Sequence, residues 1–202
     1  VVHGYSGTAA NRLYFIGDPD CNHFPNVTKG VVRITLSDVN DVPTTSTSVY
    51  VINSNGKDYI TWKNVCVDGG TKDTDTYNNY QTSYGFRCAT EGDFMETINC
   101  MAQNLYYGYH DVYWMKDCIA MTCYQGYEYG VIADGCISMG CYYPFARQNG
   151  NYNCIAIGGG QTAFYFPGDM FNCATFGAQT GVWAASSTEV KNCLFVGHNT
   201  GV

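Results

Sequence analysis

The chain has 202 residues and a formal net charge of −7, with 13% charged, 46% hydrophobic and 15% aromatic residues. This length supports one sizeable core, and the acidic balance argues against nucleic-acid binding, which needs a basic face. Because charged residues are about half their usual share of roughly 25%, Tyr, Asn, Thr and Gly must cover much of the exterior. Such a composition suits an extended contact surface better than a freely diffusing monomer.

Residues 1–57 predict an irregular N-terminal β segment, because short runs rich in Val, Ile and Tyr alternate with stretches of Gly, Pro, Asn and Asp. Residues 58–202 predict a regular repeat, with the polar stretch 71–84 inserted as a loop. No segment has a helical apolar period, and none is apolar for long enough to insert into a membrane. The chain starts without Met and stops within a repeat, so we expect part of a longer polypeptide or a processed product.

A cysteine recurs through the second half of the chain at spacings of 18, 18, 18, 19 and 20 residues. The six members are Cys100, Cys118, Cys136, Cys154, Cys173 and Cys193. A fixed period near 20 predicts one structural unit repeated, each copy burying its apolar side against the next. Cysteines at one repeat position stack in a column instead of pairing. We therefore expect buried, reduced thiols and assembly in a reducing compartment.

Both faces of the repeated strand are apolar, and alternate residues of a strand point to opposite faces. If the cysteines and the residues two positions later face inward, Ile and Met face outward. The outward residues would be Ile119, Ile137, Ile155, Met121, Met139 and Ile157. The opposite register would bury these and expose Cys and Ala. An exposed strip of this size exceeds what soluble monomers usually tolerate, so the first register predicts a homo-oligomer or docking in a larger assembly.

An amide or turn residue precedes most of the repeated cysteines. The amides are Asn99, Asn153, Asn172 and Asn192, with Asn64 at the matching position earlier in the chain. Asp117 and Gly135 interrupt the series. A coil of 18–20 residues with Asn at one corner is typical of a parallel β-helix. The leucine-rich repeat shares the period but needs a Leu framework, and this chain has four Leu.

The segments YITWKNVCVDGG (59–70) and VKNCLFVGHNTG (190–201) resemble coils of the right-handed parallel β-helix, or pectin-lyase-like, superfamily. That group includes pectate lyases, polygalacturonases and phage tailspikes, and the resemblance covers roughly residues 50–202. It implies an all-β, single-stranded right-handed parallel β-helix. It also implies that the corner Asn side chains hydrogen-bond along the axis, so we expect Asn153 and Asn172 to be hydrogen-bonded and buried.

Enzymes of this fold commonly use acidic residues that project from neighbouring coils. Asp117 and Asp134 lie on adjacent coils and could form a glycosidase pair, but Asp117 occupies the Asn column, which favours a structural role. His110 and Asp111 could be a general base with its orienting partner, or simply exposed turn residues. The Asn-Thr-Asp, paired-Asp and Gly-His-Gly motifs that the resemblance would require of a hydrolase are missing. We therefore expect no catalytic residue.

The carboxylates Asp68, Asp73 and Asp75 could form an oxygen-rich cation site. They also suit a solvated polar insertion, which we favour. The sequence therefore predicts no metal and no cofactor.

Tyrosines recur in successive repeats. Because neighbouring coils of a β-helix are about 4.8 Å apart along the axis, these tyrosines predict an amphipathic strip with one ring per coil. The candidates for contact with a glycan or a partner are Tyr106, Tyr107, Tyr109, Tyr124, Tyr127, Tyr142 and Tyr143. The alternative is that they stack within the wall of the β-helix.

These features favour a structural or adhesive β-helix of a virus particle or similar assembly, such as a tailspike, fibre or capsid-decorating protein. It would assemble in a reducing cytoplasm, contact a surface polysaccharide, and form a homo-oligomer, with a trimer as the first expectation because phage β-helices are commonly trimeric. A polysaccharide lyase or glycoside hydrolase of the same fold is the alternative. A secreted cell-surface adhesin is the third hypothesis, and it would place the chain outside the cell with oxidised cysteines.

Overall fold

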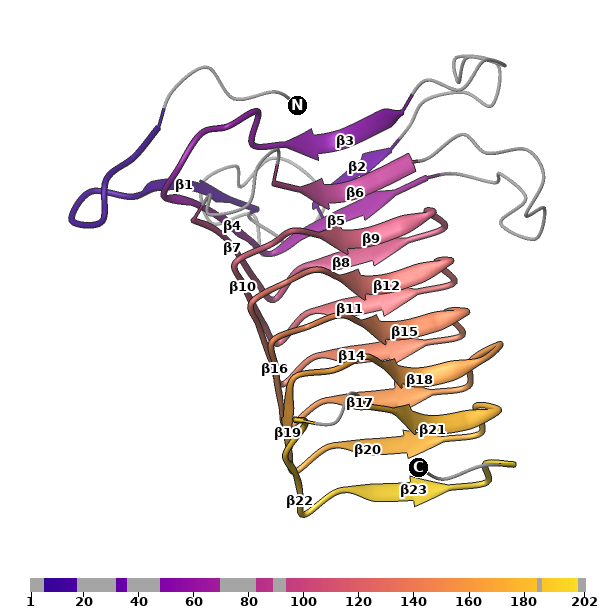
Figure 1. Ribbon diagram of the computed structural model, residues 1–202. Helices are drawn as coiled ribbons and strands as arrows, with labels where there is room; N and C mark the ends of the chain where they lie inside the picture. The colour runs from indigo at the N-terminus through magenta and orange to yellow at the C-terminus, as the bar shows by residue number, and fades with distance from the viewer. Residues whose placement is uncertain are drawn as a thin grey trace.

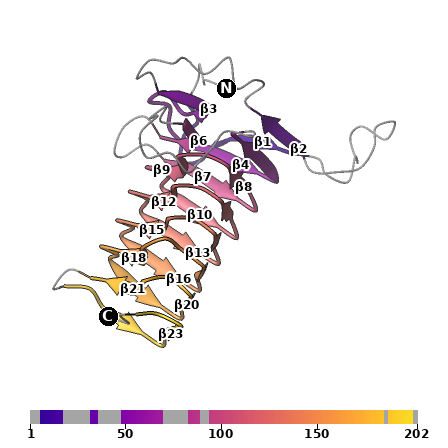
Figure 2. The same ribbon diagram turned by 90° about the vertical axis from the view of Figure 1, so that its right-hand side faces the viewer.

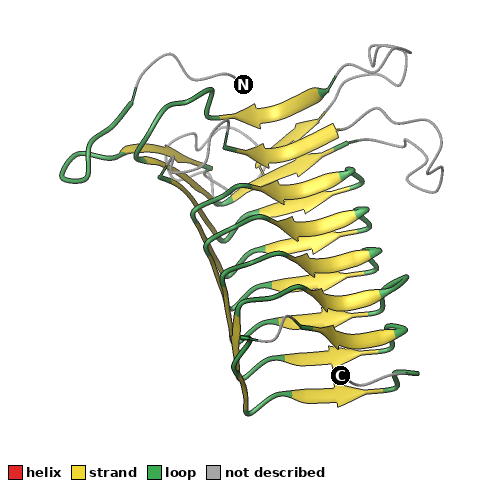
Figure 3. Ribbon diagram, viewed as in Figure 1, coloured by secondary structure: helices red, strands yellow, loops and turns green. Residues whose placement is uncertain are grey.

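The computed structural model describes residues 6–17, 32–35, 48–69, 83–88, 94–184 and 187–199. The chain winds as a right-handed parallel β-helix, with successive coils stacked along one axis (Figure 1). Every regular element in the described ranges is a strand (Figure 3). Those ranges hold no helix long and apolar enough to cross a membrane. The predicted fold class is confirmed.

Each coil contributes one strand to each of three sheets, except that the last described coil, with β22 and β23, has none in the third sheet, and the three sheets run side by side down the molecule (Figure 2). Sheet 1 contains β1 Leu13–Ile16, β4 Ile60–Lys63, β7 Met95–Ile98, β10 Trp114–Lys116, β13 Ile132–Asp134, β16 Gly150–Tyr152, β19 Asp169–Phe171 and β22 Val190–Lys191. Sheet 2 contains β2 Val32–Thr35, β5 Val65–Asp68, β8 Met101–Gln103, β11 Ile119–Met121, β14 Ile137–Met139, β17 Ile155–Ile157, β20 Ala174–Phe176 and β23 Leu194–Val196. Sheet 3 contains β3 Val49–Asn53, β6 Ser83–Arg87, β9 Tyr107–His110, β12 Gln125–Glu128, β15 Tyr143–Ala146, β18 Thr162–Tyr165 and β21 Thr180–Trp183.

Three corners join the sheets. The first corner leads from sheet 1 to sheet 2, the second from sheet 2 to sheet 3, and the third from sheet 3 to sheet 1 of the next coil. Strands β1, β2 and β3 already pair in parallel with β4, β5 and β6, so described residues before position 58 contribute a coil of their own. The division into segments 1–57 and 58–202 stays a prediction.

The cysteine column lies inside the first corner. Cys100, Cys118, Cys136, Cys154 and Cys173 are buried, whereas Cys193 in the last coil is half-buried. All ten cysteines in the described ranges are free thiols. Their Sγ atoms donate to backbone carbonyls of the same or the preceding coil, as Cys154 Sγ does to Ala133 O at 3.4 Å. Burial raises the pKa of the Cys136 thiol well above its ordinary value, so Cys136 acts as a small neutral core residue.

The strand parity follows the first of the two predicted registers. Ala120, Ser138, Ala156 and Thr175 are fully buried, and each follows a column cysteine by two residues. The Ile and Met side chains between them lie on the outer face of sheet 2, where Ile119, Ile137 and Ile155 pair in register. Sheet 2 therefore has an apolar outer face.

Aromatic rings fill the interior behind sheet 3. Phe86, Tyr109, Tyr127, Phe145 and Phe164 stack with centroid separations of 5.1, 4.8, 4.7 and 4.8 Å along the axis. The Tyr127 hydroxyl donates to the Cys118 carbonyl at 2.6 Å. Because they are fully buried, Tyr109 and Tyr127 cannot contact a glycan or a partner, and their prediction as surface residues was wrong.

Tyr109 and Tyr127 are buried because the alternation of inward-facing and outward-facing residues is interrupted in their strands. In β9 and β12, Gly108 and Gly126 face inward together with the tyrosine that follows, so Tyr107 and Tyr109 point to opposite sides although they are two residues apart. A Cβ atom on Gly108 would lie 2.6 Å from the Gly126 carbonyl oxygen of the next coil. Such a close approach permits only glycine.

The first corner carries a ladder of side-chain hydrogen bonds. Asn99 Nδ2 donates to Asn64 Oδ1 at 2.9 Å, Asn172 Nδ2 to Asn153 Oδ1 at 3.3 Å, and Asn192 Nδ2 to Asn172 Oδ1 at 3.4 Å. The burial expected for Asn153 and Asn172 was wrong, because both side chains are exposed. Their left-handed backbone, with φ of 55° and 56°, turns the side chains away from the interior.

Candidate functional site

The outer face of sheet 3 and the third corner gather most of the polar and aromatic side chains that are not in the core. We call this surface the polar–aromatic face. Its members on sheet 3 are Tyr84, Tyr107, His110, Gln125, Glu128, Tyr143, Tyr165 and Trp183, and at the third corner Asp111, Tyr129, Arg147 and Phe166. Parallel register places His110 beside Glu128 on the adjacent strand.

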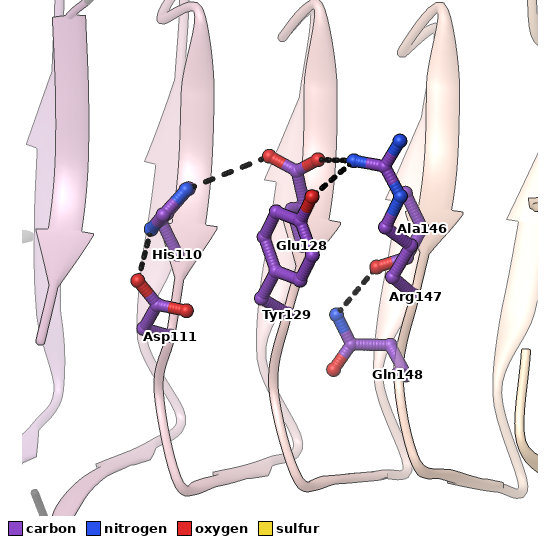
Figure 4. A network of polar contacts seen from close by, with 7 residues as sticks. All are labelled: His110, Asp111, Glu128, Tyr129, Ala146, Arg147 and Gln148. Atoms are coloured by element: carbon purple, nitrogen blue, oxygen red, sulfur yellow. Dashed lines mark hydrogen bonds and ion pairs between the residues drawn. The ribbon is translucent and has the colours of Figure 1, made fainter. Parts of the chain in front are cut away.

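Glu128 is the centre of a polar network on this face (Figure 4). Its Oε1 accepts a hydrogen bond from Arg147 Nη1 at 2.9 Å, and its Oε2 lies 3.6 Å from His110 Nε2. The other ring nitrogen of His110 lies 2.7 Å from Asp111 Oδ2. With its amide nitrogen turned toward the carboxylate, Gln125 donates to Glu128 Oε1 at 2.6 Å. Neighbouring side chains therefore shield a carboxylate that is only 2% exposed.

Burial raises the pKa of Glu128, although His110 and Arg147 act in the opposite direction. Burial also raises the pKa of Tyr107, and the charge of Glu128 adds to that shift. A shielded carboxyl with a raised pKa keeps its proton to a higher pH than an ordinary glutamate does. The same network fixes the positions of His110 and Arg147.

The tyrosines that follow the second corner form a second stack outside the core. Tyr106, Tyr124 and Tyr142 are half-buried, with ring centroids 4.6 and 5.1 Å apart along the axis. Because their ring faces contact one another, this stack presents ring edges and hydroxyl groups outward. Tyr107 and Tyr143 lie next to it on sheet 3, where the Tyr143 hydroxyl donates to Gln161 Oε1 at 2.6 Å.

The third corner has an unusual backbone for its side chains. Asp111, Tyr129, Arg147 and Phe166 have φ of 57°, 54°, 54° and 45°, in the left-handed region. Bulky residues are rare there, since Cβ crowds the following carbonyl. Tyr129 is nevertheless 46% exposed and Phe166 40% exposed, so the interior gives no reason for their size.

The structure separates the remaining predicted carboxylates from this network. Asp117 is exposed at the first corner, and Asp134 on sheet 1 accepts a hydrogen bond from Asn153 Nδ2 at 2.9 Å. The first corner is across sheet 1 from the third, so neither residue joins the His110–Asp111 pair.

Asp68 is fully buried on sheet 2, where Arg33 pairs with it and the amides of Gln103 and Asn104 donate to it at 2.9 and 3.0 Å. Asp73 and Asp75 lie outside the described residues. Within the described ranges, no group of three His, Cys, Asp or Glu side chains is placed to hold a metal ion.

Sequence reasoning missed Glu128, Arg147 and Trp183. A signal was present, because Asp111, Tyr129 and Arg147 each follow a column cysteine by 11 residues. The repeat of the cysteine column therefore also marks this corner in the sequence.

Comparisons with known proteins give no relative from which a role could be carried over. No family model matches the chain, and neither a curated protein nor a solved structure matches it. The fold is thus established by the strand register alone, and the geometry described above is the basis for any function.

Proposed function

We propose that this chain is a structural and adhesive β-helix of a virus particle or similar assembly, of the pectin-lyase-like and tailspike type. We propose further that it contacts glycans through the polar–aromatic face and the tyrosine stack of the second corner. The observation that carries this proposal is the concentration of aromatic side chains and hydrogen-bonding groups on one side of a chain with only 13% charged residues.

The side chains on this face suit a sugar polymer. Tyrosine rings are amphipathic, and Tyr106, Tyr124 and Tyr142 present ring edges and hydroxyl groups at one coil's spacing. Binding sites for small polar molecules combine aromatic surface with a few fixed polar groups. His110 and Arg147 provide such groups, since Asp111 and Glu128 hold them in place.

The assembly part of the proposal is supported by the outer face of sheet 2. Ile157, Phe176, Leu194 and Val196 are exposed large hydrophobic residues on three consecutive strands of this sheet, β17, β20 and β23. Exposed apolar patches of this kind mark association surfaces. We propose a homo-oligomer or a docked position at this face, with a trimer as the first expectation. Light scattering at micromolar concentration is the measurement, and a stable monomer would contradict this part.

Glycan contact is tested by binding to an immobilised panel of surface polysaccharides and their oligosaccharides. Tyr124→Ala should weaken the binding of any glycan that the wild-type chain retains. Tyr152→Ala is the matched control, because Tyr152 also stacks on an aromatic neighbour, Phe171, but on sheet 1. Equal binding by wild type and Tyr124→Ala, or no binding to any glycan of the panel, would contradict the proposal.

A second candidate function, glycan cleavage, is favoured by one specific observation. Glu128 has a raised pKa and lies 3.6 Å from His110, whose Nδ1 is 2.7 Å from Asp111 Oδ2, and a carboxyl beside a histidine can supply a general acid and a general base. Incubation of the retained glycan with wild type and Glu128→Gln tests it. Cleavage by wild type that is lost in Glu128→Gln would favour the enzyme, and an intact glycan would exclude it.

A further inference from the structure

The six thiols of the cysteine column occupy equivalent positions in successive coils. Each Sγ donates to a backbone carbonyl on sheet 1 of the preceding coil, at distances of 3.3 to 3.8 Å. The accepting residues are Trp62, Thr97, Met115, Ala133, Asn151 and Met170. These residues are themselves in register on neighbouring strands. The six sulfur atoms are therefore related by a shift of one coil along the axis.

The distance between neighbouring sulfurs is set by the distance between coils. The aromatic rings of the interior repeat at 4.7 to 5.1 Å along the same axis. Paired strands have the same separation, so neighbouring sulfurs are about 4.8 Å apart. Burial and then the thiols of Cys118 and Cys154 raise the pKa of Cys136, which shows that each sulfur has those of the adjacent coils as direct neighbours.

The column has a defined beginning and one accessible member. Val65 occupies the matching position one coil before Cys100, because Cys66 and Met101 are in register. The members from Cys100 to Cys173 are buried, whereas Cys193 is half-buried. Within the described chain, a small ion in solution therefore reaches the column first at Cys193.

The sulfur spacing matches a soft metal ion that binds in a line between two thiolates. A metal–thiolate bond is about 2.3 Å long, so two such bonds in line span about 4.6 Å. Copper(I) and silver(I) have a filled d shell, favour sulfur ligands and accept two ligands in a line. Zinc(II) needs four ligands in a tetrahedron. No group of three His, Cys, Asp or Glu side chains in the described ranges is placed to hold a metal ion, so each ion in this column has two ligands.

The charge of the ion also has to suit a buried, neutral column. A monovalent ion that replaces one S–H proton leaves the charge of the column unchanged. A divalent ion that replaced one proton in every gap would add one positive charge per coil. Burying an unpaired charge costs several kcal/mol, so the column favours monovalent ions.

We propose that the cysteine column binds copper(I) or silver(I) as a row, with each ion bridging the sulfurs of two neighbouring coils. Six sulfurs enclose five gaps, so a full row holds five ions. Each ion forms two metal–sulfur bonds and one S–H proton passes to solvent for every ion bound, which leaves one S–H in the column. No electron is transferred. This site is independent of the proposed glycan contact.

Silver(I) is the probe for the experiment, because it is stable in air. Silver nitrate is added in chloride-free buffer to the reduced full chain, and a second sample is refolded from urea with silver present, since most of the column is buried. Native mass spectrometry counts the ions per chain, a pH indicator counts the protons released, and X-ray absorption counts the sulfur neighbours of each silver. Circular dichroism verifies that each sample is folded.

The variants are chosen so that a row and independent thiols give different counts. Cys136→Ala divides the column into rows of two and three sulfurs, which enclose one gap and two gaps, so it should lose two ions and two protons. Cys154→Ala divides it in the same way and is the second variant if the first does not fold. Cys100→Ala shortens the row at its end and should lose one ion. Cys66→Ala is the matched control, because it removes a buried free thiol outside the column and should lose none.

Two sulfur neighbours per silver in the folded chain, together with these losses, would support the proposal. A loss of one ion in every variant, Cys66→Ala included, would overturn it by showing independent binding to single thiols. Loss of the β-sheet circular dichroism signal when silver binds, three or more sulfurs around each silver, or no bound silver in either sample would also overturn it.

Discussion

The first and third corners have the same left-handed backbone but differ in the residues that adopt it. The first corner uses Asn, Asp and Gly, and its exposed amides hydrogen-bond along the axis, as Asn99 does to Asn64 at 2.9 Å. The third corner has Asp111 in one coil, and in the next three coils it has Tyr129, Arg147 and Phe166, whose size the conformation disfavours. One corner of the repeat thus turns the chain with residues that readily adopt a positive φ. Another corner has bulky side chains in the same conformation, which suggests that they are retained for contacts with other molecules.

We expect buried side chains to contribute most of the free energy of unfolding and exposed corner side chains to contribute little. Tyr127→Ala is expected to have the largest effect, lowering the free energy of unfolding by about 3–5 kcal/mol, because it removes a fully buried ring from the aromatic stack. Urea unfolding of wild type and variant measures it.

Tyr124→Ala is the control, since Tyr124 stacks in the same way outside the core. We expect it to cost less than about 1.5 kcal/mol. A cost for Tyr124→Ala equal to that for Tyr127→Ala would show that the outer stack supports the fold, and the comparison would then fail.

A smaller effect is expected at the first corner. Asn172→Ala should lower the free energy of unfolding by about 1–2 kcal/mol, because alanine is less stable at a φ of 56° and cannot take part in the amide ladder. Asn172→Gly keeps the backbone preference and removes only the side chain, so it should cost less. If glycine proved as costly as alanine in denaturant titrations, the ladder rather than the backbone would dominate this corner.

The Glu128 network on sheet 3 should produce a pH dependence of stability. Because the pKa of Glu128 is raised in the folded chain, the folded state binds more protons than the unfolded state between the ordinary glutamate pKa and the raised value. Stability contributed by this group therefore falls as pH rises through that window, by at most about 1.4 kcal/mol per pH unit, and levels off above it. Subtracting the pH profile of Glu128→Gln from that of wild type isolates the effect. A difference that rises with pH would contradict the assigned direction.

The sequence predicted the coils well because their determinants are local. Cys118 and Cys136 are 18 residues apart, and one coil of this length places them above each other with Ile119 and Ile137 in register. Asn99 and Asn153 likewise predict the first corner, because asparagine adopts a positive φ more readily than most residues.

The sequence did not predict the candidate site equally well, because there the local rules fail. Alternation would place Tyr107 and Tyr109 on one side, but inward-facing Gly108 separates them, so one is on the surface and the other in the core. Arg147 and Phe166 give no turn signal, since Arg and Phe are unusual at a positive φ. Only the three-dimensional stacking of coils brings His110, Glu128 and Arg147 together.

The most direct test is to replace Phe166 by glycine and to measure both the free energy of unfolding and the affinity for a glycan that the wild-type chain retains. Glycine relieves the backbone at a φ of 45° and removes an exposed ring. The account predicts a free energy of unfolding within about 1 kcal/mol of wild type and an affinity lower by about tenfold. Asn153→Gly at the first corner should leave the affinity unchanged. A loss of more than about 2 kcal/mol with unchanged affinity would contradict the account, because the third corner would then serve the fold as the first corner does.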